Sequence, residues 1–230
     1  MLRSLALPVF LAVSLAATIT CTGSDASGMS LEEGRKFWAF KPIAAPTLPS
    51  GESHALDAFL SDPLASKGIQ RAPQADKRTL IRRATYDLTG LPPSNADVQA
   101  FLKDTSTNAF EKVIDRLLAS KHYGIRWGRH WLDVARYADS NGLDENLAFG
   151  HAWRYRDYVI DSFNADKPFD RFIVEQIAGD LVPHANQETI TATGFLALGA
   201  RVLAEKDREK LMMDVVDEQI DTLSKAFLGM

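Results

Sequence analysis

Residues 123–140 read YGIRWGRHWLDVARYADS. Trp127, Trp131, Val134 and Ala138 recur in this stretch at steps of three and four, which predicts a helix that turns one apolar face towards a core. Segments with the same spacing lie on both sides of it, and none shows the sustained period-two alternation of hairpin strands. The sequence therefore predicts an all-α fold, an irregular assembly of about seven to nine helices.

Local signals predict where several of these helices begin and end. Asp76 and Ser94 each precede an apolar-periodic segment and are residue types that favour helix N-caps. Residues 89–93, TGLPP, end the first of these segments, and Pro63 is expected to end or kink the helix that begins near His54. The last periodic segment carries an apolar stripe of Met212, Val216, Ile220, Leu223 and Phe227.

Composition excludes several classes of function. The chain has 230 residues, a net charge of −4 and an ordinary globular share of apolar residues. There is no basic excess that would indicate a nucleic-acid partner. Cys21 is the only cysteine, so the chain contains neither an intrachain disulfide nor the C-x-x-C-H motif that attaches haem c. The histidines show no H-x-x-x-H spacing, which argues against a transition-metal site.

The first 26 residues have the pattern of a signal peptide. Arg3 supplies a positive charge, and the apolar run from Leu5 to Ile19 is shorter than a membrane span of about 20 residues. We therefore expect an exported protein of the periplasm or cell envelope, without a transmembrane span in the mature chain. The pattern favours soluble export over lipid anchoring through Cys21, because threonine and isoleucine rather than small residues precede that cysteine.

A proline-rich extended arm is predicted over residues 27–51, followed by a helical domain over residues 52–230. Pro42, Pro46 and Pro49 favour an extended tether. The aromatic cluster of Phe37, Trp38 and Phe40 is expected to dock the arm onto the domain, with a platform for carbohydrate or a protein partner as the alternative.

The end of the sequence predicts an incomplete domain. The last apolar stripe is still in phase close to Met230, and no glycine followed by polar residues closes the helix. We expect exposed apolar surface around Phe227, Leu228 and Met230, as in a chain that is cut short.

The 123–140 stretch also carries candidate catalytic residues, namely Arg126, His130, Asp133 and Arg136. Their spacings of three and four place them on neighbouring helical turns, where surface ion pairs are the simpler interpretation. The alternative is a polar site in which His130 carries a proton, Asp133 orients it and an arginine binds an anion.

Two acidic groups are candidate cation sites. Asp139, Asn141 and Asp144 surround a glycine and loosely resemble a calcium loop, but the EF-hand spacing is absent and a simple polar turn at Asn141 is the favoured interpretation. Asp214, Asp217, Glu218 and Asp221 form an acidic stripe on the last helix. This stripe is either a solvated face, a surface for a cation or basic partner, or a set of partners for arginines such as Arg82, Arg83 and Arg136.

Four long motifs resemble a known family. They are residues 79–93 (TLIRRATYDLTGLPP), residues 123–140, residues 153–158 (WRYRDY) and residues 163–170 (FNADKPFD). In this order they are similar to the planctomycete cytochrome-c-associated proteins that carry domain of unknown function 1549. The resemblance implies an envelope location and a large multi-domain parent, in which a C-x-x-C-H haem motif follows a stretch like residues 216–229.

Three functions are compatible with these observations. The first is a non-catalytic helical module of a larger exported cytochrome-c-type protein, partnered by the rest of that polypeptide or by another envelope protein. This chain itself then binds no cofactor, and haem c belongs to the parent. The second is an envelope enzyme acting on a carbohydrate or sulfated polymer near His130. The third is a structural or partner-binding domain without a redox link.

Overall fold

The computed structural model describes residues 30–49, 54–143 and 146–229. Within these ranges the chain forms ten α-helices and no strand, apart from an isolated antiparallel bridge between Ser140 and Ala148. The predicted all-α class is confirmed. The helices in excess of the predicted number are short ones.

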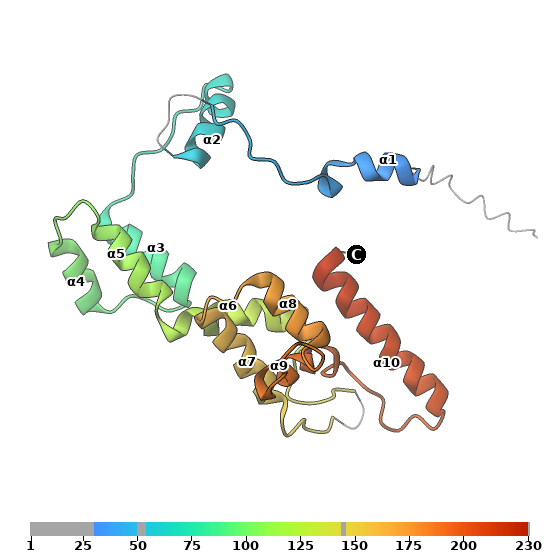
Figure 1. Ribbon diagram of the computed structural model, residues 1–230. Coiled ribbons are helices and arrows are strands. Elements are labelled where there is room, and N and C mark those ends of the chain that lie inside the picture. Colours follow the sequence, from blue (N-terminus) through green and yellow to red (C-terminus); the bar gives the residue numbers. More distant parts are fainter. Residues whose placement is uncertain (1–29, 50–53, 144–145, 230) are drawn as a thin grey trace, which may run out of the picture. The chain divides into compact units, whose positions relative to one another are not determined.

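The described residues fall into two units, which divide between Ala72 and Pro73. The first contains α1 (Leu31–Lys36), the short 3-10 helix η1 (Trp38–Phe40) and α2 (Ala55–Ser66) (Figure 1). The second contains α3 (Lys77–Thr89), α4 (Asn95–Lys103), α5 (Ala109–Leu118), α6 (Lys121–Val134), α7 (Ala152–Asn164), α8 (Phe169–Ala178), α9 (Gln187–Ala192), η2 (Thr193–Leu196), α10 (Arg208–Leu223) and the terminal turn η3 (Ser224–Leu228).

Two local predictions concern the first unit. The arm that was expected to be extended contains α1, which the Ser30 and Glu33 side chains cap reciprocally. Pro63 lies inside α2 and does not end it, since the helix continues to Ser66. A proline removes a single backbone donor, and here that loss comes only one turn before the helix ends.

The helices α3, α4 and α5 of the second unit enclose one apolar core. Its buried members are Ile81, Ala84, Phe101, Ala109, Val113 and Leu117. The predicted caps are confirmed, because Asp76 accepts a hydrogen bond from the backbone N–H of Thr79 (2.9 Å) and Ser94 accepts one from Asp97 (3.1 Å). Gly90 ends α3 in the left-handed conformation, with a φ of 71°, which glycine adopts more readily than other residues.

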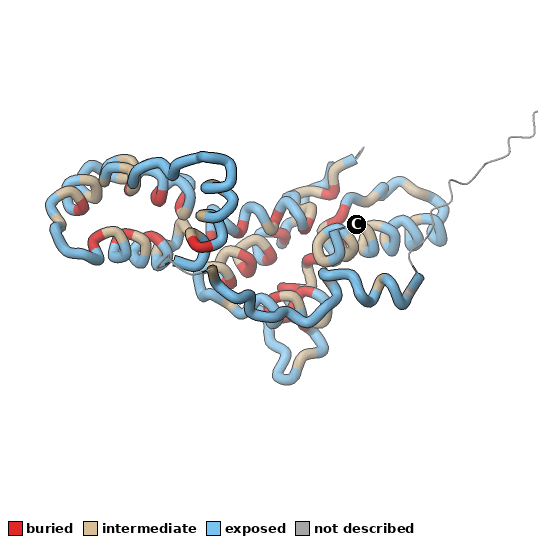
Figure 2. The backbone as a smooth tube through the Cα atoms, turned by 90° about the horizontal axis from the view of Figure 1, so that it is seen from above, coloured by how far each residue is buried: buried red, intermediate tan, exposed pale blue. Residues whose placement is uncertain are grey.

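A second core of the same unit lies among α6, α7, α8, α9 and η2. Its buried members are Leu132, Ala135, Tyr155, Tyr158, Val159, Phe172, Ala192 and Phe195. Figure 2 shows buried residues concentrated on the inner sides of the helices. The helices α6 and α7 approach closely at Gly124, whose backbone N–H donates to Asn164 Oδ1 (2.8 Å).

Candidate functional site

The face that α6 turns towards α7 is a stripe of small and aliphatic residues. Gly124, Gly128 and Leu132 are buried at intervals of four, and Ala135 continues the stripe past the helix end. Small residues at this spacing let two helix backbones come close together. Aromatic spacing predicted a different face, and the glycines at positions 124 and 128 were the signal that would have identified the right one.

Consequently Trp127 and Trp131 lie in different surroundings. Trp127 is 38% exposed and its ring lies beside those of Tyr123 and His130, so its predicted place in the core is wrong. Trp131 packs at the edge of the second core, as predicted, with its ring centroid 5.0 Å from that of Phe172 and 5.8 Å from that of Phe195.

The structure separates the four candidate catalytic residues. Arg126 and His130 are exposed on α6, and the side chain of Arg126 lies against Gly90. Asp133 pairs with Arg129 at 3.0 Å, the i,i+4 surface pair of the simpler interpretation. Arg136 lies beyond the helix end and pairs with Glu218. The arrangement gives His130 no carboxylate within hydrogen-bonding distance among the described residues.

A buried polar cluster that the sequence analysis missed lies instead between α7 and α8. The indole N–H of Trp131 donates to Gln176 Oε1 (2.8 Å), and the hydroxyl of Tyr155 donates to the same oxygen. Burial raises the pKa of Tyr155 well above its usual value, so this hydroxyl keeps its proton and serves as a donor.

Glu175 is the centre of an ionic network beside this cluster. Its side chain is 2% exposed, and Lys167 Nζ lies 2.6 Å from its Oε2. The hydroxyl of Tyr158 donates to Oε2 (2.9 Å) and Arg171 Nε donates to Oε1 (2.7 Å). Lys167 also binds Glu188 on α9 at 2.8 Å. Two cations and two carboxylates therefore join α8 and α9 to α7 and the loop that follows it.

The pKa values in this network move away from neutrality. Burial would raise the pKa of Glu175, but hydrogen bonds from Lys167, Arg171 and Tyr158 outweigh it and leave the pKa lowered. Burial and the adjacent carboxylate raise the pKa of Tyr158 far above its usual value. Groups whose pKa values lie so far from neutral pH are poor proton carriers. The arrangement is suited to holding three helices together.

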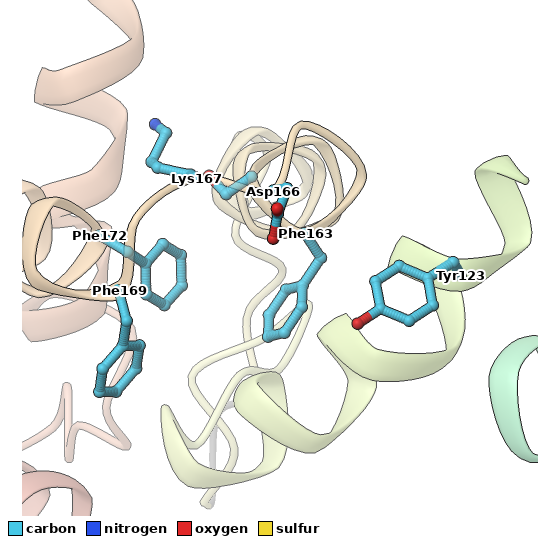
Figure 3. Close-up of a pocket in the computed structure, with 7 residues that line it drawn as sticks. Tyr123, Phe163, Asp166, Lys167, Phe169 and Phe172 are labelled. Atoms are coloured by element: carbon cyan, nitrogen blue, oxygen red, sulfur yellow. The ribbon is translucent and has the colours of Figure 1, made fainter. Parts of the chain in front are cut away.

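An aromatic pocket lies next to this network (Figure 3). Rings from α6, α7 and α8 line it, those of Tyr123, Phe163, Phe169 and Phe172. The amino group of Lys167 turns away from the rings towards its carboxylate partners. The volume of about 180 Å³ is below the roughly 300–1,000 Å³ of typical ligand pockets, so the pocket is best described as a packing crevice.

The residues of the predicted calcium loop have structural partners. Asp139 accepts a hydrogen bond from the Tyr137 hydroxyl (2.6 Å). Asn141 is buried, donates to the carbonyl of Arg201 (2.9 Å) and accepts from the N–H of Leu147 (2.6 Å). Asp144 lies outside the described residues. Among those described, no three His, Cys, Asp or Glu side chains are grouped to hold a metal ion.

The last helix has one face on the core and an apolar stripe beside it. Thr222 is buried, and Leu223, Ala226 and Phe227 pack on the second core. We define the α10 apolar stripe as Met212, Met213, Val216 and Ile220, whose residues are 38% to 62% exposed. The predicted exposed surface at the chain end is correct for Leu228 but not for Phe227, whose ring lies 6.0 Å from that of Trp131. Met230 is not described.

The predictions for the acidic stripe and for the end of the last helix can also be compared with the structure. Of the acidic stripe, Glu218 pairs with Arg136, one of the arginines considered for it, and Asp221 pairs with Lys225 at 2.7 Å. Gly229 adopts a left-handed conformation and its N–H bonds the carbonyl of Ser224, so the helix end is capped after all.

No helix that the structure describes combines the length and apolar character needed to cross a bilayer.

Comparison with known proteins identifies the family of this chain but no individual relative. Searches among curated proteins and among solved structures each found no match. The profile of the proteins of unknown function DUF1549 (PSCyt2) matches residues 55–230, which contain all four motifs, and the chain therefore belongs to this family.

Proposed function

We propose that this chain is an exported, non-catalytic helical module that packs against further polypeptide through α10. The partner is the remainder of a larger cytochrome-c-type envelope protein. The observation that supports this proposal is the α10 apolar stripe, because contiguous apolar surface on a soluble domain marks interaction sites. Asp214 and Asp217, both exposed on the same helix, favour a partner whose contact surface is basic at its edge.

The enzyme alternative has less support. It requires Asp133 to orient His130, whereas Asp133 pairs with Arg129. In the buried Glu175 network, the pKa of Glu175 is lowered and that of Tyr158 is raised, which makes both groups poor proton carriers at neutral pH.

Hydroxyl-radical footprinting tests the proposal. The purified chain is compared with the same protein in the envelope fraction of cells that produce it. We expect Met212 and Met213 to be oxidised several-fold more slowly in the envelope fraction, with exposed Tyr86 on α3 as the internal control. Equal oxidation in both samples would contradict docking through α10. The gene sequence beyond codon 230 separately tests the haem-bearing parent, because a C-x-x-C-H motif is either encoded there or not.

A further inference from the structure

Arg136 occupies an unusual position just after α6. Its φ is +56°, in the left-handed region that non-glycine residues seldom adopt. Its side chain is 23% exposed, and Nη1 pairs with Glu218 of α10. Nε and Nη2 are buried and donate to no acceptor in the described part of the chain. Buried donors without an acceptor are rare in folded proteins and call for an explanation.

The neighbouring backbone is shaped around this guanidinium. A Cβ atom added to Gly199 would lie 3.0 Å from Nη1 and 3.2 Å from Nη2 of Arg136, closer than side chains ordinarily approach. The absence of a side chain at position 199 thus leaves room for the guanidinium. The strained backbone of Arg136 and the missing side chain of Gly199 together position a guanidinium, which is permanently charged, between the end of α6 and α10.

The two free nitrogens form one edge of the guanidinium. The edge that carries Nε and Nη2 matches the paired oxygens of a carboxylate, phosphate or sulfate group. Arg156 shows how the same edge is used elsewhere in this molecule, since its Nε and Nη2 both donate to Asp157 Oδ1, at 3.0 and 2.8 Å. Among the residues that the structure describes, the corresponding edge of Arg136 has no such partner.

We propose that the Nε–Nη2 edge of Arg136 is a binding site for a small oxyanion, a carboxylate, phosphate or sulfate group. The site uses no side chain of the α10 apolar stripe and goes beyond the packing function proposed above. Near Arg136, α10 is held by Glu218 and by the bond from Gln219 Nε2 to the carbonyl of Leu196 (3.2 Å). Because Nε and Nη2 are buried, the proposed site requires this part of α10 to move aside for the ion, while Leu223 and Phe227 hold the end of the chain on the core.

Arginine side-chain NMR tests this site directly. The Nε–Hε resonance of Arg136 in the ¹⁵N-labelled chain is assigned by its loss in Arg136→Lys. Sodium phosphate, sulfate and acetate are then titrated separately, with sodium chloride holding the ionic strength constant. We expect a saturable shift of this resonance with at least one of the three anions. The titration that produces the shift identifies the class of oxyanion. The Arg156 resonance, whose edge is occupied, should not move.

Substitutions test whether the anion binds to the Nε–Nη2 edge of Arg136. Arg136→Lys keeps the charge but not the paired donors, so we expect it to weaken binding, measured by calorimetry, by about tenfold or more. Arg156→Lys is the matched control and should bind as the wild type does. Gly199→Ala should also weaken binding, because its Cβ crowds the guanidinium. The inference is overturned if none of the three anions shifts the Nε–Hε resonance of Arg136 saturably. This titration uses the wild-type chain, so its outcome does not depend on whether the variants fold. Equal binding by Arg136→Lys would overturn the inference as well.

Discussion

At the scale of single residues, Trp127 and Trp131 form a matched pair on one helix. Trp131 has ring contacts within the second core and donates a hydrogen bond to Gln176, whereas Trp127 is partly exposed. We expect Trp131→Ala to lower the free energy of unfolding by about 3–5 kcal/mol, and Trp127→Ala by about 1 kcal/mol or less. Urea denaturation followed by circular dichroism measures both values. Equal losses would mean that the assignment of the two environments is incorrect.

Glu175 allows a second comparison at this scale. Glu175→Gln removes the charge that balances buried Lys167 and its neighbour Arg171, so we expect a loss of about 3–5 kcal/mol in unfolding free energy. Glu188→Gln removes the other, largely exposed partner of Lys167 and should cost about 1 kcal/mol or less. Comparable values for both variants would show that the network is not centred on Glu175.

The same carboxyl group predicts a pH dependence. The pKa of Glu175 in the folded protein is lower than its ordinary value of 4.5, so the folded state binds a proton less readily than the unfolded state does. Its stabilisation is therefore complete above pH 4.5 and is lost as the pH falls through the folded-state pKa. We expect the unfolding free energy of the wild type to fall more steeply below pH 4.5 than that of Glu175→Gln. Parallel pH profiles would rule out this contribution.

At the scale of elements, the contact between α6 and α7 depends on Gly124 more than on Gly128. A Cβ atom at position 124 would come within 3.0 Å of the Ile160 carbonyl oxygen, whereas one at position 128 would meet side-chain carbons at 3.4 Å. Gly124→Ala should lower the unfolding free energy by about 1–3 kcal/mol through overpacking. Gly128→Ala should be neutral or stabilising by up to about 1 kcal/mol, since alanine favours the helix. Thermal denaturation of both variants checks this order.

At the scale of the whole molecule, α10 combines a covered end with an uncovered stripe. Ile220→Gln changes an exposed position, so stability should change by no more than about 0.5 kcal/mol while binding of an apolar dye decreases. Phe227→Ala removes a ring that packs on Trp131 and Phe195, and it should lower the unfolding free energy by about 2 kcal/mol or more. Dye fluorescence and urea denaturation separate the two effects. A large loss of stability in Ile220→Gln would show that the stripe is already covered.

The sequence by itself determined the all-α class and the helix starts at Asp76 and Ser94, because periodicity and capping are local properties of the chain. It also determined the family, through four motifs in order. Only the tertiary structure decided which face of α6 is buried, because the small size of Gly124 matters only once α7 packs against it. Likewise Glu175 with Lys167, and Arg136 with Glu218, are brought together by the packing of separate helices. Residues that are far apart in the chain acquire charge partners only when the helices that carry them meet, and no local pattern contains that information.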